Sequence, residues 1–249
     1  MIKAVIVDLD GTLLRKDQSV SEFTLGTLRK CREKGIKVMV ATARPRRSSR
    51  MYTDIIDFDA MTFSNGARVI CGGRMTDIAV PFENVAQTLD ALSGFVNTRI
   101  TLETGDNAFS NRDVGDFPTV VVEDLLKVAK TEKVLKVVAH IPDDPDVVKI
   151  KLPEELYFSV SGGYYMQIMN RDATKWNGVK AMLDYFGIAP AEAAYFGDDF
   201  DDIEPIRHCG VGVTSANAID EVKAVADHVT VSNNEDGVAK FIEGMILGK

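Results

Sequence analysis

Two aspartates near the start of the chain have a spacing that could support chemistry. Asp8 and Asp10 follow Ala4 to Val7, an apolar run that predicts a strand buried on both faces. Both carboxylates can point into one pocket, since they lie two positions apart in extended or turning backbone and Gly11 permits a sharp turn. Two carboxylates this close repel each other unless a cation or a shared proton lies between them. Taken alone, the pair could also be an ordinary Asp-Gly turn.

A second group of carboxylates follows a later apolar run. Ala193 to Phe196 predicts another buried strand, and Gly197 ends it. An acidic loop at a helix start would explain one or two carboxylates here, but hardly four in five positions. Such a group needs a cation, and its hard oxygen ligands suit Mg²⁺. The four are Asp198, Asp199, Asp201 and Asp202, and the sequence leaves open whether the last two contact a metal directly or through water.

A hydroxyl and an ammonium group stand where they could meet an anion. Thr42 follows the predicted strand Ile36 to Ala41 and precedes a helix start at Pro45, where exposed N–H groups favour phosphate. It could equally be a plain helix cap. Lys175 falls in the first turn of a predicted helix, where a cation opposes the helix dipole unless an anion lies nearby. Four arginines just after Thr42 could bind a small anion, although the last three could equally form a solvated helix face: Arg44, Arg46, Arg47 and Arg50.

The elements that carry these residues indicate a parallel sheet. Between the first two strands, Ser19 and Glu22 have capping-box spacing, and the helix that they begin ends at Gly35. A third strand, Ala60 to Phe63, leads into Ser64-Asn65-Gly66, and a later helix capped by Asp172 or Thr174 precedes the fourth strand. Strand, helix, strand units of this kind place strand ends at one edge of the sheet.

The middle of the chain has a different pattern. Gly72-Gly73 and Gly162-Gly163 each lie between two strand-like runs and predict hairpins, hence antiparallel sheet. We therefore expect residues 1–66 and 171–249 to form one domain and residues 67–170 to be an inserted α+β unit. Its expected elements are a helix with Val85, Leu89, Leu92 and Val96 on one face, a strand near Ile100, a helix near Leu125 and a strand from Leu135 to His140.

These motifs, in this order, resemble those of the haloacid dehalogenase superfamily. The string from Asp8 to Leu13 is similar to its first motif, Thr42 to its second, Lys175 to its third and the run from Gly197 to Asp202 to its fourth. The segments Asn217-Ala218 and Glu235 to Val238 resemble the end of the same subgroup. The sequence departs from the usual family motifs at Ala43 and Trp176, where Gly is usual, at Asp201, where Asn is frequent, and in the segment Thr214-Ser215-Ala216.

The resemblance is to Cof-type hydrolases of subfamily IIB, with a C2-type cap. It implies an α/β fold in which a Rossmann-like parallel-sheet core carries an inserted α+β cap that selects the substrate. The implied activity is that of a Mg²⁺-dependent phosphatase acting on small phosphomonoesters, with sugar phosphates favoured, through an aspartyl-phosphate intermediate. The physiological substrate and its range remain open.

The resemblance also implies roles for individual residues. Asp8 would be the nucleophile and Asp10 the general acid and base. Mg²⁺ would be held by Asp8, Asp198 and the backbone carbonyl of Asp10, with Asp199 and Asp202 supporting these ligands. Thr42 would hold a phosphoryl oxygen and Lys175 would balance charge. The remaining expected contacts to the substrate phosphate come from Leu9, Ala43, Arg44 and Asn65.

Two other functions are compatible with the sequence. One is phosphotransfer of the phosphomannomutase type, which would need a second phosphate site, and Arg99, Arg112 and Arg171 are too scattered to predict one. The other is a non-catalytic Mg²⁺- or phosphate-binding module. Loss of Asp10 would be typical of that role, and Asp10 is present.

The composition narrows the possible classes of protein further. With 249 residues, 45% of them hydrophobic, the chain can build a substantial core. Its net charge of −8 disfavours nucleic acid as a partner but permits a small phosphorylated metabolite. No signal peptide or membrane-spanning run is expected, so we predict a cytoplasmic protein. Three widely spaced cysteines, Cys31, Cys71 and Cys209, predict buried thiols. The oligomeric state is open.

Overall fold

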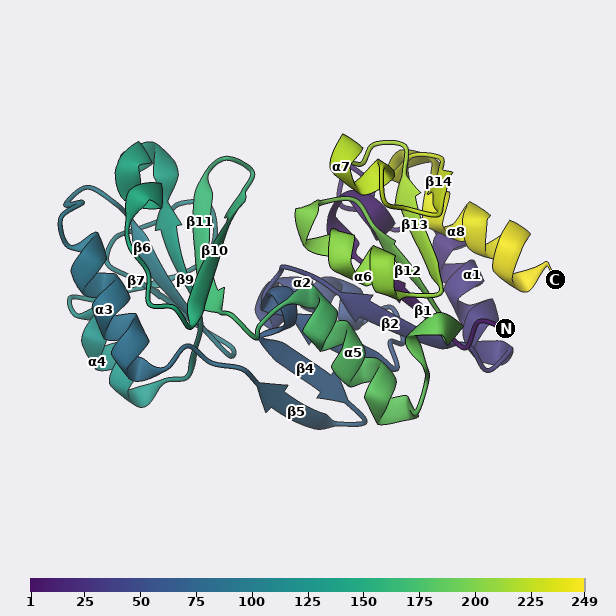
Figure 1. Cartoon of the computed structure of the whole chain (residues 1–249), viewed down its shortest axis with the longest axis horizontal. Helices are drawn as coiled ribbons and strands as arrows, with labels where there is room; N and C mark the ends of the chain where they lie inside the picture. The colour runs from purple at the N-terminus through teal and green to yellow at the C-terminus, as the bar shows by residue number, and fades with distance from the viewer. Residues whose placement is uncertain (249) are drawn as a thin grey trace. The chain divides into compact units, whose positions relative to one another are not determined.

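In the computed structural model, which describes residues 1–248, the chain groups into two units (Figure 1). The first contains residues 1–44, 48–76 and the described residues from 174 onward, and the second contains residues 45–47 and 77–173. Within these residues no helix is both long enough and apolar enough to cross a bilayer. All three cysteines are buried free thiols, as expected.

An eight-stranded sheet forms the centre of the first unit, in the order β14-β13-β12-β1-β2-β3-β4-β5. The strands from β14 to β3 pair in parallel, and β4 pairs with β3 antiparallel. The strand bounds are β1 (Ala4–Val7), β2 (Lys37–Ala41), β3 (Ala60–Phe63), β4 (Arg68–Cys71), β5 (Arg74–Asp77), β12 (Ala193–Gly197), β13 (Val211–Ser215) and β14 (His228–Thr230).

Helices cover both faces of this sheet. Side chains of β1 alternate between two apolar clusters: Ile6 packs with Val179 of α5, while Val5 and Val7 pack in the cluster that holds Leu28 of α1. Strand β1 is thus buried on both faces, and the α/β fold class with a parallel sheet is confirmed. The helices are α1 (Glu22–Glu33), α2 (Arg46–Thr53), α5 (Lys175–Phe186), α6 (Ile203–His208), α7 (Asp220–Lys223) and α8 (Gly237–Phe241), with shorter helical turns that include η1 (Leu9–Leu13), η2 (Ser64–Gly66), η6 (Phe200–Asp202) and η8 (Ile242–Leu247).

The second unit has a six-stranded sheet in the order β10-β11-β9-β6-β7-β8. Its pairs are antiparallel except for β7 with β8, so this unit is of the α+β kind. In Figure 1, α3 and α4 lie together on one side of this sheet. The bounds are α3 (Phe82–Leu92), β6 (Ile100–Thr104), β7 (Ala108–Ser110), β8 (Val120–Val121), α4 (Leu125–Thr131), β9 (Val134–His140), β10 (Leu156–Ser161) and β11 (Tyr165–Asn170).

Three local expectations are corrected by the structure. The cap of α1 is Ser21, which accepts from the Thr24 N–H, because the Ser19 hydroxyl is engaged with Asp17 instead. The hairpin at Gly72-Gly73 belongs to the first unit and not to the insert, because β4 pairs with β3 of the core sheet. Val96 lies beyond the end of α3 and is 75% exposed, so it is not part of that helix's buried face.

Candidate active site

The site begins where β1 ends. The backbone N–H of Asp8 donates to the carbonyl of Phe196 at 2.9 Å, so the parallel pairing of β1 with β12 continues up to the first aspartate. The chain then turns through η1, in which Gly11 has a φ of +73°. A Cβ on Gly11 would overlap Oδ2 of Asp198. Only glycine therefore lets this turn approach the carboxylate at the end of β12 so closely.

Lys175 joins two buried carboxylates. Its ammonium group donates to Asp8 Oδ1 at 3.1 Å and to Asp202 Oδ1 at 2.6 Å, and all three side chains are at most 6% exposed. Burial by itself would lower the pKa of Lys175, but Asp202 and Asp8 outweigh it and raise that pKa. Burial also raises the pKa of Asp8 well above its usual value, and Lys175 offsets only part of this effect. The lysine at the start of α5 therefore lies against two carboxylates, which is one of the two interpretations that its position left open.

Asp202 holds the loop after β12 in place. Its Oδ1 accepts from Lys175 and from the Tyr195 hydroxyl at 2.6 Å, and its Oδ2 accepts from the backbone N–H groups of Asp198 and Asp199 at 2.9 and 3.1 Å. The residue is fully buried. With four donors on its two oxygens, Asp202 fixes Lys175 and the backbone of Asp198.

Asp198 faces Asp8 across this edge of the sheet. Its Oδ1 accepts a hydrogen bond from Thr12 Oγ1 at 2.5 Å, and burial raises its pKa to about 7 despite that bond. Carboxylate oxygens of Asp8, Asp198 and Asp202 lie within 4.8 Å of one another. When all three carboxylates are ionised they outweigh the single charge of Lys175, so a further cation would stabilise the ionised cluster, and oxygen donors are the ligands that Mg²⁺ prefers. The residues present therefore fit a Mg²⁺ ion.

Thr42 and Arg44 lie at the end of β2. Thr42 is fully buried, and its Oγ1 accepts from the backbone N–H of Arg44 at 3.1 Å, as a cap would. The guanidinium of Arg44 is bound to Asp10 through both carboxylate oxygens, with Nε to Oδ2 at 2.6 Å and Nη2 to Oδ1 at 2.5 Å. Arg44 thus pairs with the second aspartate of the first motif.

The remaining expected residues have distinct surroundings. Asn65 donates through Nδ2 to Asp201 Oδ2 at 2.6 Å, while its buried Oδ1 has no hydrogen-bond partner among the described residues. Asp199 accepts from the Phe200 N–H at 2.8 Å and so caps the turn η6. Leu9 is fully buried in the apolar core of the first unit. Of the two acids on either side of Phe200, Asp201 therefore contacts Asn65, whereas Asp199 has a local role.

Three residues that support the site did not appear among the sequence candidates. Tyr195 and Thr12 bind Asp202 and Asp198 as described above, and Asn217 Nδ2 donates to the Gly11 carbonyl at 2.8 Å. A weak signal existed for each, because Thr12 and Asn217 lie inside motif strings and Tyr195 is the polar residue of an apolar strand. None of these signals indicates the partner atom.

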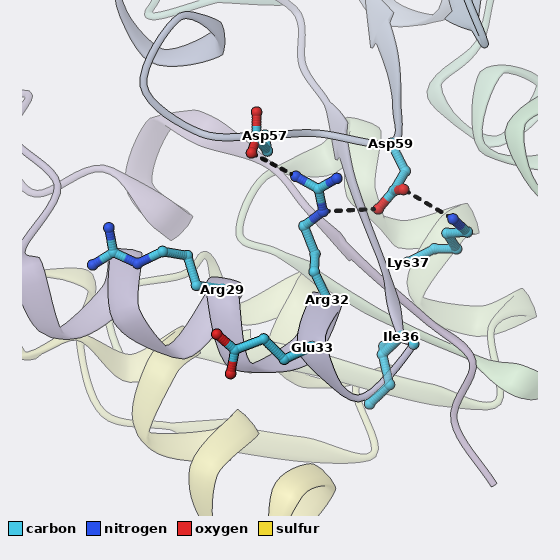
Figure 2. Close-up of a pocket in the computed structure, with 8 residues that line it drawn as sticks. Arg29, Arg32, Glu33, Ile36, Lys37, Asp57 and Asp59 are labelled. Carbon is cyan, nitrogen blue, oxygen red and sulfur yellow. Dashed lines mark hydrogen bonds and ion pairs between the residues drawn. The ribbon is translucent and has the colours of Figure 1, made fainter.

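A pocket at the opposite edge of the same sheet lacks comparable chemistry (Figure 2). It encloses about 430 Å³ beside Lys37 at the start of β2. Figure 2 shows Arg32 between Asp57 and Asp59, at 2.9 and 3.7 Å, and Lys37 bound to Asp59 at 3.0 Å. These acidic and basic groups neutralise one another, so the pocket does not resemble the cluster of carboxylates around Asp8.

Comparison with known proteins identifies similar chains. The family model of haloacid dehalogenase-like hydrolases matches residues 5–242. The chain is 29% identical to 5-amino-6-(5-phospho-D-ribitylamino)uracil phosphatase YitU of Bacillus subtilis, with 96% of each chain covered. It is 25% identical to phosphoglycolate phosphatase 1 of Saccharolobus solfataricus, over 100% of this chain and 98% of that one.

Solved structures agree on the fold. A haloacid dehalogenase-like hydrolase from Bacteroides thetaiotaomicron superposes with a TM-score of 0.87 at 23% identity, covering 99% of this chain and 100% of that one. A sugar phosphatase of subclass IIB superposes with a TM-score of 0.82 at 24% identity, covering 97% and 98%.

Proposed function

The chain belongs to the family of haloacid dehalogenase-like hydrolases, and we propose that it is a Mg²⁺-dependent phosphatase that acts on small phosphomonoesters through an aspartyl phosphate on Asp8. One observation carries this proposal. Asp8, Lys175 and Asp198 meet at the carboxyl edge of a parallel sheet, where open α/β folds bind their ligands. A nucleophile, a buried cation and a cation-binding carboxylate are the parts that phosphoryl transfer requires.

Asp8 attacks phosphorus in the first step. An oxygen of its carboxylate forms the new bond as the bond from phosphorus to the leaving oxygen breaks, and Asp10 gives that oxygen a proton. In the second step Asp10 takes a proton from water, which attacks the phosphoryl group and frees Asp8. Asp10 is 49% exposed and can therefore meet both water and a leaving group, whereas Asp8 is buried and is held by Lys175.

Asp8, Asp198 and the backbone carbonyl of Asp10 would hold Mg²⁺. The ion would supply positive charge that lets a carboxylate approach a phosphate dianion. Asp202 keeps Asp198 in place through the backbone N–H of that residue and keeps Lys175 close to Asp8. Thr12 orients the Asp198 carboxylate through its hydroxyl.

The phosphoryl oxygens would meet donors from the ends of β1 and β2. We assign the Thr42 hydroxyl and the backbone N–H groups of Leu9 and Ala43 to this role. Asn65 would lie beside the phosphate at the next strand end. Its unpartnered buried Oδ1 is an acceptor and calls for a donor, such as a water molecule or a substrate hydroxyl. Arg44 would contribute charge near the phosphate while paired with Asp10.

The unit of residues 77–173 would select the leaving group, as an insert of this kind does in the family. We propose sugar phosphates as the class of substrate, because the fold is similar to that of the subclass IIB sugar phosphatase. Phosphotransfer gains no support from the three arginines considered for a second phosphate. Arg99 binds Asp143, and Arg112 and Arg171 donate to the backbone carbonyls of Val96 and Glu154.

The test is phosphate release from a panel of hexose phosphates, phosphoglycolate, pyridoxal phosphate and nucleotides, with Mg²⁺ or EDTA. Asp8→Asn is the control, because it keeps the size of the side chain and removes the nucleophile. We expect turnover that requires Mg²⁺ and is lost in the variant. Wild-type turnover by Asp8→Asn, or equal turnover in EDTA, would contradict the proposal. Isomerised hexose phosphate in place of free phosphate would indicate a mutase.

A further inference from the structure

The loop between η1 and α1 is bound to a loop near the C-terminus. Arg15 binds Asp236 through two hydrogen bonds of 3.2 and 2.8 Å, and the backbone N–H of Lys16 donates to Asn234 Oδ1 at 2.9 Å. The loop also closes on itself, since the Gln18 N–H donates to the Arg15 carbonyl at 2.8 Å. Its tip therefore has a fixed place relative to Asp10, although it is exposed.

Gln18, at this tip, has a backbone conformation that non-glycine residues rarely adopt. Its φ is +67°. Strain of this kind persists where the surroundings determine it, and it is frequent near functional sites. The side chain supplies a reason, because its Oε1 accepts a hydrogen bond from Nη2 of Arg44, the nitrogen that also binds Asp10.

Tyr52 of α2 completes the surroundings of the guanidinium. Its ring is 2% exposed and lies with its centroid 5.3 Å from Cζ of Arg44. Its hydroxyl also approaches Gln18 Oε1, at 3.4 Å. Arg44 is therefore held by an aromatic ring and an amide oxygen as well as by the Asp10 carboxylate.

We propose that Gln18 and Tyr52 are positioning residues that hold Arg44 against Asp10 and so fix the direction in which the Asp10 carboxylate exchanges its proton. The inference rests on the role proposed above for Asp10 as acid and base. Arg44 occupies one lone pair on each Asp10 oxygen. The guanidinium therefore fixes the plane of the carboxylate, and with it the direction of the remaining lone pair on each oxygen, one of which would face the leaving oxygen in the first step and water in the second.

The test compares two substrates that differ in their need for a proton. An alkyl phosphomonoester requires protonation of its leaving oxygen, whereas p-nitrophenyl phosphate has a leaving group that departs as an anion. Gln18→Gly removes the acceptor and keeps the backbone free to adopt positive φ. We expect it to lower kcat/KM for the alkyl ester about tenfold, a part of the roughly 10²- to 10⁴-fold that general acid catalysis contributes, with little change for p-nitrophenyl phosphate.

Further variants separate positioning from folding. Gln18→Glu keeps an acceptor at the same distance and should retain the wild-type ratio between the two substrates. Gln18→Asn tolerates the same backbone but shortens the side chain, so it should behave like Gln18→Gly. Tyr52→Phe keeps the ring and should have a smaller effect than Gln18→Gly. Lys16→Ala, in the same loop, should match the wild type, because it is the backbone of Lys16 that bonds to Asn234.

Other results would overturn the inference. Equal losses for both substrates in Gln18→Gly and Gln18→Asn, or no loss for either, would mean that Gln18 does not act through Asp10. Asp10→Asn distinguishes this failure from failure of the proposed function. If Asp10→Asn loses the alkyl ester and the Gln18 variants do not, only the positioning role is wrong. If Asp10→Asn keeps wild-type kcat/KM for that ester, the acid role itself is wrong.

Discussion

Replacing Lys175 with methionine tests the electrostatics of the site most directly. The substitution keeps the length of the side chain and removes the positive charge that lies between Asp8 and Asp202, both of which are almost completely buried. Removing one partner of a buried ion pair costs about 3–5 kcal/mol, since the other charge is left without compensation. For a protein of this size each kcal/mol shifts Tm by about 2–4 °C, so Lys175→Met should melt about 6–20 °C below the wild type in EDTA.

The matched control lies one and a half turns further along α5. Lys180 pairs with Asp184 at 2.6 Å, but these side chains are 54% and 60% exposed. Because exposed pairs of this spacing contribute about 0.3–0.5 kcal/mol, Lys180→Met should melt within about 2 °C of the wild type. Thermal unfolding followed by circular dichroism measures both variants. The reasoning is refuted if the two variants melt together, or if Lys175→Met melts with the wild type.

The pH dependence of thermal stability provides a second test of the same variant. The Asp8 pKa is already raised in the folded protein by burial, and loss of Lys175 raises it further. An acid with a raised folded pKa favours folding below its unfolded pKa and loses that contribution as pH rises through the folded value. The difference in Tm between Lys175→Met and the wild type should therefore shrink from pH 8 to pH 5. A difference that grows on acidification would contradict this account.

Two predictions concern the metal. Gly11→Ala should weaken Mg²⁺ binding about 10- to 100-fold by calorimetry, because the new Cβ displaces Asp198, whereas Gly26→Ala, with no atom within 4 Å, should leave it unchanged. Equal affinities for the two variants would count against the proposed ligand. Since burial raises the pKa of Asp198 to about 7, Mg²⁺ must displace a proton below that pH, and its apparent Kd should rise about tenfold per pH unit from pH 7 to 5. A Kd independent of pH would mean that Asp198 stays ionised or does not bind the ion.

The edge of the sheet at which the candidate site lies could be predicted, because the carboxyl ends of parallel strands share one edge. Asp8, Thr42 and Asp198 each follow an apolar run, and parallel strands bring such ends together whatever the loops do. The contact between Lys175 and Asp8 spans 167 positions, and the place of Lys175 at a helix start left its role open, so the expectation that it lies near Asp8 came from the family resemblance. The hairpin at Gly72-Gly73 could not be assigned in this way, because turn residues specify a hairpin and not the sheet that it extends.

Roles within the acidic run could not be predicted from its composition. Asp198, Asp199 and Asp202 are chemically alike, and only the direction of the turn after β12 separates them. That turn buries Asp202 beneath Lys175, leaves Asp199 as a local cap and directs Asp198 toward Asp8. The partners of side chains that lie in loops are harder still to predict from the sequence. Gln18 reaches Arg44 because of a positive φ that no propensity for glutamine would suggest.

The charges around Asp8 give a physical reason why the proposed reaction would need a divalent ion. The two cations that the structure places against these aspartates are already engaged, Lys175 with Asp8 and Asp202, and Arg44 with Asp10. Asp198 adds a further carboxylate. A phosphate dianion entering such a site would meet net negative charge, so the proposed ion would support substrate binding as well as the chemical step. Removal of Mg²⁺ should then abolish binding of the phosphomonoester by Asp8→Asn, in which no turnover obscures the measurement.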